Sequence, residues 1–396
     1  MNGFKQLISS TIKVDVEFFD DTHKDLLCDR NKYPIEVIRK MKHAVKNGLS
    51  ISGVDFLTYY LFHNKRYGID KQNFIEAIPA QSDLLSLHLD VNNSQMFKRH
   101  NVALPKEITE HIGESVGMLL ISHCFNITSA DWGFISESNK AKTLDCSLAI
   151  SDDALIELEA KGTSAKVLNL SGPSNSILDK KKENKRPKGN YSYGSITTID
   201  MQRLTCYLLD PPGTDKRLDY TRLRFINNLK YYNEVFKVIA PKSELIDVLN
   251  ERIEEINSSE GYSFDTLRPK NRYEFNYGSG NEPTFFFRSY YHERGPVKFG
   301  GRFFYINKST TLFVGVTNDL LNRVVGQDPF NISSHDERVN IVSINEKVNG
   351  SAFQKTQRDE SDINSMDNAF GNKEGVRVKG RVYIKNGLAL GILDYN

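Results

Sequence analysis

The sequence predicts an α/β protein in which a mixed sheet is flanked by helices, with a helical region before it and a β-rich region after it. Three observations lead to this class. Residues 105–125 carry apolar side chains at helical spacing, residues 144–150 and 154–160 form short apolar runs with alternating polar residues, and aromatic residues gather after residue 273. Helical and strand patterns that alternate along one chain are typical of α/β domains.

The length of the chain predicts more than one domain. A chain of 396 residues exceeds the size at which a single hydrophobic core stops growing, which is about 250–300 residues. We expect a mostly helical region over 1–100, the α/β core over 101–258 and a β-rich region over 259–396. Hydrophobic residues make up 39% and charged residues 26% of the chain, as in ordinary globular proteins.

Composition and charge exclude several classes of protein. No stretch approaches the roughly 18 apolar residues of a membrane-spanning helix, and the N-terminus lacks the pattern of a signal peptide. We therefore expect a cytoplasmic protein with no membrane partner. The four cysteines form no C-x-x-C pair, which argues against a zinc site or a disulfide framework. Because the net charge is only +2, binding to a nucleic acid would need a local basic patch.

The helical region is expected to begin with residues 33–48, "YPIEVIRKMKHAVKNG", which end on Gly48, a common helix stop. Residues 52–68 form a second helical candidate. Two interpretations stay open for the basic residues of these segments: a DNA-binding face, or an ordinary solvated face, which is the commoner role. These residues are Lys40, Lys42, Lys46, Lys65 and Arg66.

A third helix is expected over residues 105–125, "PKEITEHIGESVGMLLISHCF". Pro105 suits the first turn of a helix, and acidic residues early in the segment suit the positive end of the helix dipole. One stripe of this helix is apolar, and another carries Glu107, Glu110 and Glu114 at helical spacing.

The two apolar runs that follow are expected to form a hairpin through the turn "SDD". Side chains of a strand alternate between its faces. In the second run the apolar residues therefore share one face, and Glu157, Glu159 and Lys161 share the other. Asp145 in the first run also lies opposite its apolar neighbours, so a tight hairpin brings these four charged residues together.

The rest of the chain supplies further elements. The basic stretch at 180–188 is expected to be a mobile loop, either gripping phosphates or simply solvated. Strands are expected on both sides of a turn within 193–213, and two helices over 221–256 with a break before Pro241. The β-rich region ends in a hairpin over 381–394 with an Asn-Gly turn.

The acidic hairpin has the chemistry of a metal site. Mg²⁺ prefers carboxylate oxygens from one or two side chains, with water and phosphate oxygens completing its shell. A bound metal ion activates an attacking water and stabilises the charge that develops on a phosphodiester. A nearby lysine orients or deprotonates that water, or neutralises the transition state.

The pattern resembles the PD-(D/E)XK nuclease superfamily, which includes type II restriction enzymes, Holliday-junction resolvases and nucleases of anti-phage systems. The resemblance covers residues 105–240. It is carried by Asp145, thirteen intervening residues, and Glu159-x-Lys161 on a strand behind an acidic helix. Leu144 stands where the family often has proline. The resemblance implies a restriction-endonuclease-like fold in which Asp145 and Glu159 bind metal, Lys161 is catalytic, and Glu114, or less favourably Glu110, supports the site.

The expected function is that of an Mg²⁺- or Mn²⁺-dependent endonuclease cutting DNA, in restriction or antiviral defence as the resemblance implies. The expected partners are DNA, a protein of a defence complex and a second copy of the chain. Three alternatives stay open. In the first, the chain is an inactive DNA-binding or scaffolding subunit. In the second, it is a structural protein that does not bind nucleic acid. In the third, the strand that carries Glu157, Glu159 and Lys161 is an amphipathic edge with surface ion pairs. The aromatic and basic residues at 285–288 and 302–305 either stack bases or, more commonly, form core.

Overall fold

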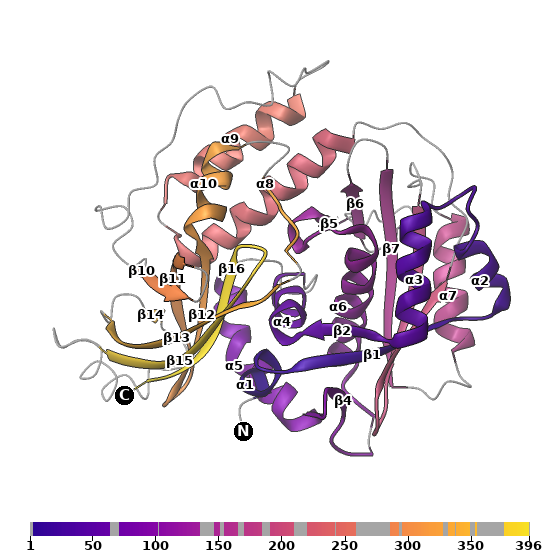
Figure 1. The fold of residues 1–396 in the computed structure, drawn as a ribbon, viewed down its shortest axis with the longest axis horizontal. Helices are drawn as coiled ribbons and strands as arrows, with labels where there is room; N and C mark the ends of the chain where they lie inside the picture. The colour runs from indigo at the N-terminus through magenta and orange to yellow at the C-terminus, as the bar shows by residue number, and fades with distance from the viewer. Residues whose placement is uncertain are drawn as a thin grey trace. The chain divides into compact units, whose positions relative to one another are not determined.

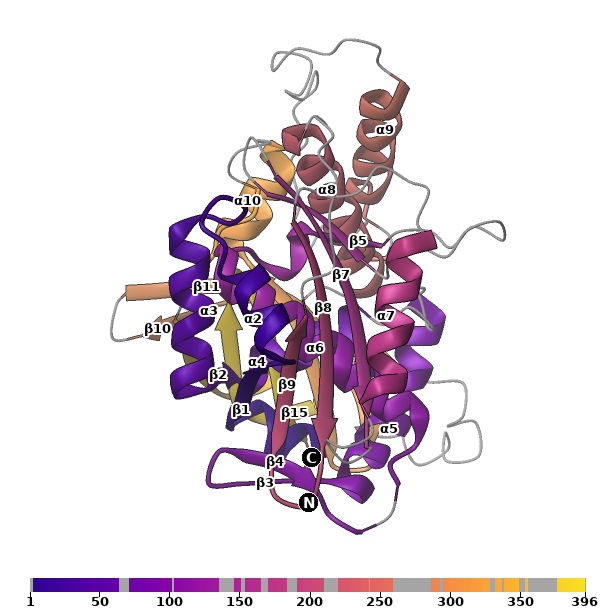
Figure 2. The same ribbon diagram turned by 90° about the vertical axis from the view of Figure 1, so that its right-hand side faces the viewer.

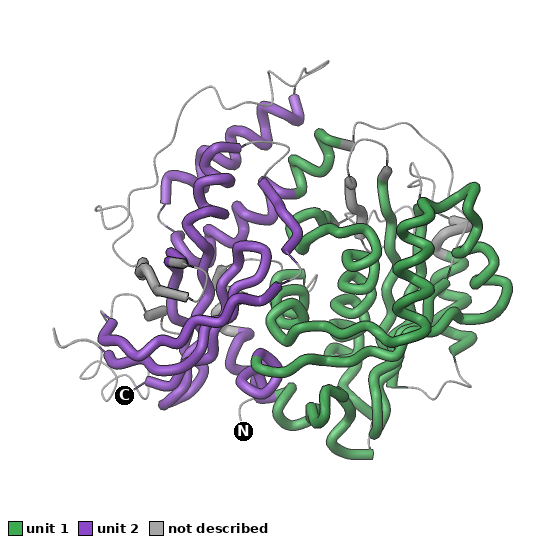
Figure 3. The backbone as a smooth tube through the Cα atoms, in the orientation of Figure 1, with its two compact units in different colours: residues 1, 9–65, 84–227 green, residues 2–8, 66–83, 228–396 purple. Residues whose placement is uncertain are grey.

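The computed structural model describes residues 3–63, 71–101, 103–134, 146–150, 154–164, 170–183, 191–209, 220–241, 243–258, 286–292, 295–327, 332–336, 338–348, 353–354 and 376–395. The chain forms two compact units (Figure 3). The first contains residues 1, 9–65 and 84–227, and the second contains residues 2–8, 66–83 and 228–396. The predicted α/β class is confirmed, because helices accompany one mixed and one largely antiparallel sheet.

The first unit contains a nine-stranded mixed sheet within the described residues, in the order β3-β4-β1-β9-β8-β7-β6-β5, with β2 paired to β1. The pairs β1–β4, β1–β9 and β7–β8 are parallel, and the others are antiparallel. Strands β7, β8 and β9 run side by side (Figure 2). The strands are β1 (Thr11–Phe18), β2 (Leu49–Ser52), β3 (Leu89–Asn92), β4 (Gln95–Lys98), β5 (Trp132–Phe134), β6 (Cys146–Ile150), β7 (Ala154–Thr163), β8 (Tyr191–Ile199) and β9 (Leu204–Leu209).

The helices of this unit include the predicted helix before the hairpin. It is confirmed as α6, and the segment at 33–48 is confirmed as α3. The helices are α2 (Asp21–Leu27), α3 (Ile35–Asn47), α4 (Gly53–Phe62), α6 (Lys106–Phe125) and α7 (Ser171–Glu183), with a 3-10 turn at η1 (Ser129–Asp131). Helices α5 (Lys71–His88) and α8 (Tyr220–Ile239) cross the boundary between the units. None of the described helices combines the length and the apolar character needed to span a membrane.

Strand β1 comes from the region expected to be mostly helical. Its segment "TIKVDVEF" alternates, so that Ile12, Val14 and Val16 are buried while Thr11 and Lys13 are exposed. This period of two is the pattern of a strand with one covered face. The N-terminal residues therefore contribute a strand to the same sheet as the predicted hairpin.

Glycines bring α6 unusually close to the sheet. A Cβ atom on Gly162 of β7 would lie 1.5 Å from the carbonyl oxygen of Thr109, and one on Gly113 would lie 2.3 Å from the backbone nitrogen of Gly162. Backbone contact at this distance requires residues without side chains. The face of β7 that carries Ala160 and Gly162 is therefore the face that packs on α6.

Helix α7 covers the opposite face. A Cβ atom on Gly194 would lie 2.8 Å from Ile177 of α7, and Gly194 pairs with Glu159 in the parallel register of β7 and β8. Paired residues of neighbouring strands point to the same face of a sheet. Helices α6 and α7 accordingly lie on opposite sides of β7 (Figure 1).

The second unit contains a seven-stranded sheet within the described residues, in the order β10-β11-β12-β16-β15-β13, with the short β14 paired parallel to β11. Strand β10 also contacts β13, so the sheet curls. One face carries an apolar cluster that includes Phe299, Phe303 and Phe313. The strands are β10 (Phe286–His292), β11 (Gly295–Asn307), β12 (Thr310–Thr317), β13 (Asn340–Val348), β14 (Phe353–Gln354), β15 (Val376–Lys385) and β16 (Leu388–Tyr395), and the helices are α1 (Gly3–Ile8), α9 (Leu245–Ser258) and α10 (Asn318–Gly326).

Two further local predictions are tested in these elements. The C-terminal hairpin is confirmed, because β15 and β16 are joined by Asn386 and Gly387 with φ angles of 51° and 82°. The prediction of a mobile loop over 180–188 is wrong for residues 180–183, because α7 continues to Glu183 and includes the three lysines 180–182. No helix-breaking residue occurs there, because the first proline after these lysines is Pro187. Residues 184–190 lie outside the described residues.

Candidate active site on strand β7

Strand β7 is a central strand with both faces covered. It pairs with β6 on one side and β8 on the other. The exposed fractions of Glu157 and Glu159 are 2% and 0%. The alternative of an edge strand with surface ion pairs is therefore excluded for these two carboxylates.

Glu159 and Lys161 lie together on the face of β7 that is turned away from α6. The Lys161 Nζ atom lies 2.6 Å from the Glu159 Oε1 atom, which is the distance of a charge-assisted hydrogen bond. The Lys161 side chain is 28% exposed, whereas that of Glu159 is fully buried. The pair thus has a solvent-accessible end at the ammonium group and a desolvated end at the carboxylate.

Asp145 lies outside the described residues. The residue that follows it, Cys146, begins β6 and pairs with Leu158, the residue that precedes Glu159. The predicted antiparallel hairpin of β6 and β7 is therefore confirmed from Cys146 onward.

Glu114 is half-buried on α6. It follows Gly113, and a Cβ atom on Gly113 would lie 2.6 Å from the backbone carbonyl carbon of Lys161. Glu114 is therefore close in space to the backbone of the E-x-K segment. Its helix, however, packs on the face of β7 opposite to the side chains of Glu159 and Lys161. The structure therefore brings the backbone of α6 close to that of β7, but it does not bring the Glu114 side chain together with those of Glu159 and Lys161.

Ser192 is a neighbour of the site that sequence reasoning missed. It pairs with Glu157 in the parallel register of β7 and β8, and it is 1% exposed. Its hydroxyl has no hydrogen-bond partner within the part of the chain that the structure describes. No local signal could have found it, because the register of two parallel strands is set by the packing of the connection between them.

Of the two expected metal ligands, Glu159 is among the described residues and Asp145 is not. Among the described residues, no group of three or more His, Cys, Asp or Glu side chains is placed to share a metal ion. Glu159 supplies one buried carboxylate, which fits a hard cation such as Mg²⁺. The second carboxylate of the expected pair, that of Asp145, is not among those residues.

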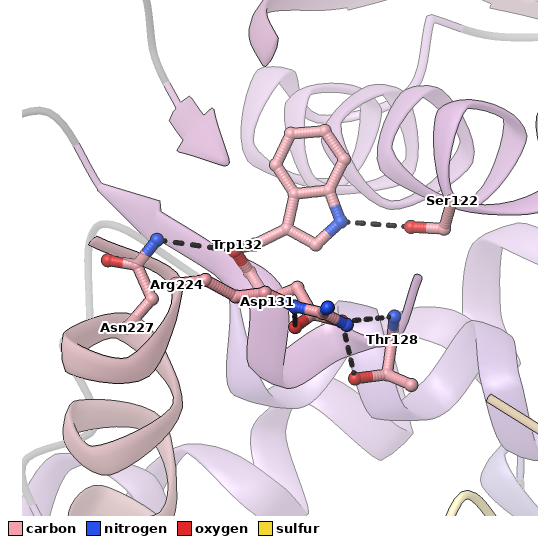
Figure 4. Close-up of polar contacts among 6 residues, drawn as sticks. All are labelled: Ser122, Thr128, Asp131, Trp132, Arg224 and Asn227. Atoms are coloured by element: carbon pink, nitrogen blue, oxygen red, sulfur yellow. Dashed lines mark hydrogen bonds and ion pairs between the residues drawn. The ribbon is translucent and has the colours of Figure 1, made fainter. Parts of the chain in front are cut away.

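A second buried carboxylate lies in the same unit, at η1 (Figure 4). Asp131 is fully buried, and its Oδ1 atom accepts a hydrogen bond of 2.7 Å from the Arg224 Nε atom of α8. Its Oδ2 atom accepts hydrogen bonds from the backbone nitrogen and the hydroxyl of Thr128, at 2.8 and 3.1 Å. The Asn227 side chain donates to its backbone carbonyl at 3.2 Å. Both carboxylate oxygens are thus occupied by groups that fix the turn and the helix.

Neighbouring polar groups extend this network. The indole Nε1 atom of Trp132 donates to the Ser122 Oγ atom at 2.9 Å, and the Tyr59 hydroxyl lies 2.7 Å from the same Oγ atom (Figure 4 shows the first of these). The network therefore joins α4, α6, η1 and α8. We assign it a structural role, because its donors and acceptors satisfy one another.

Other candidate residues prove to be core. Phe303 and Phe304 are fully buried, which confirms the core interpretation of residues 302–305 for these two side chains. The side chains of residues 285–288 lie outside the described residues. Burial raises the pKa of the Cys124 and Cys206 thiols to about 12, so both stay protonated and are poor nucleophiles.

Comparison of the chain with protein-family models, curated proteins and solved structures gives no match.

Proposed function

We propose that the chain is a metal-dependent endonuclease that hydrolyses DNA phosphodiester bonds. The observation that carries the proposal is the Glu159 carboxylate, which is fully buried in a central strand with the Lys161 ammonium 2.6 Å away. Taking a carboxylate out of water costs several kcal/mol. Its counter-ion comes from the same strand, so a carboxylate and an ammonium group lie side by side on an interior strand, an arrangement suited to metal-assisted hydrolysis of a phosphodiester.

Each residue has a defined role in this proposal. Asp145 and Glu159 bind the metal, which is Mg²⁺ or Mn²⁺ and which, when bound, activates water and stabilises charge on the phosphate. Lys161 orients or deprotonates the attacking water, and its partial exposure leaves it accessible to substrate. Glu114 would support the site only indirectly, through the backbone contact of α6 with the segment at Lys161, because its helix covers the opposite face of β7.

The order of elements supports the proposal. Helix α6 is followed by the antiparallel strands β5, β6 and β7, then by α7, by β8 parallel to β7, and by β9 and α8. This agrees with the order that the resemblance to PD-(D/E)XK nucleases implies, with the E-x-K on an interior strand. Under this proposal the first unit carries a restriction-endonuclease-like core.

The same resemblance extends the proposal to the biological setting. A nuclease of this class would act on DNA in the cytoplasm, in restriction or antiviral defence. A protein of a defence complex and a second copy of the chain are the proposed partners. These points depend on the nuclease activity itself and are tested after it.

The experiment is cleavage of supercoiled plasmid and phage DNA in Mg²⁺, Mn²⁺ or EDTA. We expect divalent-dependent nicking by the wild type, and its loss in Lys161→Ala and Glu159→Gln. Lys237→Ala is the matched control, because Lys237 lies 2.6 Å from Glu234 in an ion pair on α8, outside the candidate site. Activity that survives in both site variants would show that these residues are not the catalytic ones.

A second candidate is an inactive subunit that binds DNA without cutting it. It would keep the fold of the first unit and the Glu159–Lys161 pair without forming a complete metal site. Such a subunit would bind DNA with an affinity that falls steeply with salt and would not respond to divalent ions. Filter binding of the same plasmid at 50 and 200 mM salt separates it from the nuclease.

A further inference from the structure

Arg302 is a buried arginine whose Nε atom has no hydrogen-bond partner among the described residues. It lies on β11 of the second unit, opposite Val314 of β12, and its exposed fraction is 5%. Within the described part of the chain its guanidinium makes no ion pair, and its Nε atom is enclosed without a hydrogen-bond partner. A guanidinium carries five N–H donors in a fixed plane, and buried donors in folded proteins are usually hydrogen-bonded. A buried guanidinium nitrogen without a partner is therefore unusual.

The surroundings of Arg302 are apolar. On its face of the sheet, the nearest paired positions are Phe304 with Leu312 and Gly300 with Val316. Phe304, Leu312 and Val314 are all fully buried. Gly300, two residues before Arg302 on the same face, adds no side chain of its own next to the guanidinium. The apolar cluster of Phe299, Phe303 and Phe313 lies on the other face.

Arg252 of α9, in the same unit, is a second buried arginine for comparison. It is 4% exposed, and its Nε and Nη2 atoms also lack a hydrogen-bond partner among the described residues, but its Nη1 atom donates to the carboxylate of Glu255 one turn along the helix. Desolvation lowers the pKa of Arg302 to about 10, so the side chain is still charged at neutral pH. A buried charge with no counter-ion destabilises a folded protein.

We propose that Arg302 is the centre of an oxyanion-binding site in the second unit. A guanidinium pairs with a carboxylate or a phosphate through two parallel N–H bonds, and this pairing is strongest where water is excluded. The enclosure of the Nε atom limits the site to a terminal phosphate or carboxylate of a small ligand. A continuous nucleic-acid backbone is not the proposed ligand, because the arginine is only 5% exposed. The site does not depend on the proposed nuclease activity.

The test is the thermal unfolding of the full chain at constant ionic strength with increasing phosphate, sulfate or acetate. We expect a saturable rise in the Tm of the second unit's transition of about 2–6 °C at ~20 mM of the preferred anion. Arg302→Met is expected to lose this response and, in chloride alone, to unfold at a higher temperature than the wild type, because an unpaired buried charge has been removed. Arg381→Met, which changes an exposed arginine of β15, is expected to keep the response.

The arms of the experiment identify the ligand class. A response to phosphate and sulfate but not acetate identifies a phosphate ligand, and an equal response to acetate identifies a carboxylate. If Arg302→Met does not fold, Arg302→Lys replaces it, with an apparent affinity expected to be at least ~10-fold weaker because the two-bond pairing is lost. The absence of any saturable anion effect on the wild type, or equal effects on wild type and variant, would overturn the proposal.

Discussion

Two buried carboxylates of the first unit are neutralised by similar cations but connect different parts of the chain. Asp131 and Glu159 are both fully buried, and their cations lie 2.7 and 2.6 Å away. The side chains of Arg224 and Lys161 are 26% and 28% exposed. The burial, distance and charge of the two pairs are thus nearly equal.

The difference lies in what each pair holds together. Asp131 and Arg224 are separated by 93 residues, and Thr128 and Asn227 add bonds to the same aspartate, so the pair fixes α8 to η1. Glu159 and Lys161 are two residues apart on one strand. The Asp131 pair therefore joins distant parts of the chain, whereas the Glu159 pair joins neighbours on one strand. Under the proposed function, the Glu159 carboxylate is a metal ligand and not a tertiary contact.

The largest effect is expected for Asp131→Asn, which removes the charge and keeps the shape. Removing one partner of a buried pair typically costs about 3–5 kcal/mol in the free energy of unfolding. Urea unfolding followed by the fluorescence of Trp132, the only tryptophan of the chain, reports on this unit directly. In Asp15→Asn, the control, the lost pair with Arg203 is partly exposed, and we expect a change below about 1 kcal/mol. Equal losses in the two variants would contradict a structural role for Asp131.

The next largest expected effect is a loss of folding stability at acid pH, caused by the protonation of His63. Burial lowers the pKa of His63 to about 4 from 6.5, although the nearby backbone of Ser129 acts in the opposite direction. The unfolded chain therefore binds more protons than the folded chain between these values. Stability is fully present above pH 6.5 and falls as the pH drops towards 4, by about 3 kcal/mol from this group.

The measurement is the urea midpoint from pH 7 to pH 4 for the wild type and His63→Phe. The phenyl ring keeps the stacking on Tyr59 but cannot bind a proton, so we expect a flatter pH profile. His43→Gln, at an exposed position of α3, is the control and is expected to follow the wild type. A His63→Phe profile as steep as that of the wild type would exclude His63 as a source of the acid sensitivity.

The smallest effect on stability is expected for Glu159→Gln. The amide keeps the volume of the side chain and removes a buried charge, and the lost pair joins two residues of one strand, whereas that of Asp131 joins η1 to α8. We expect the free energy of unfolding to change by less than about 1 kcal/mol, or to increase. A loss as large as that in Asp131→Asn would remove the distinction between the two carboxylates and with it the main support for a catalytic Glu159.

Local patterns were enough to predict several elements. Helix α6, the alternation along β7 and the hairpin of β15 and β16 follow from residue spacing and from an Asn-Gly turn. The alternation also predicted that Glu159 and Lys161 share a face, because neighbours two apart on a strand always do.

The remaining features depend on contacts between residues far apart in the sequence, so local patterns could not predict them. The burial of Glu159 depends on β8 and α7, which follow it in the chain, and Ser192 reaches the site only through the parallel register. Arg302 is part of an alternating strand like many others, and the sequence does not reveal that its side chain is buried. Strand β1 is readable from the alternation of its own residues, and only its place beside β9 is set by long-range pairing.

The position of β1 has a consequence for how the chain is made. Asp15 pairs with Thr205, about 190 residues later, so the centre of the sheet stays open until β9 has been synthesised. At ordinary rates of translation this interval lasts roughly 10–40 s. During that time the edge of β1 that later pairs with β9 is unpaired, and unpaired edges promote aggregation. We expect the yield of folded protein to rise when expression is slowed by cooling or when chaperones are supplied in excess.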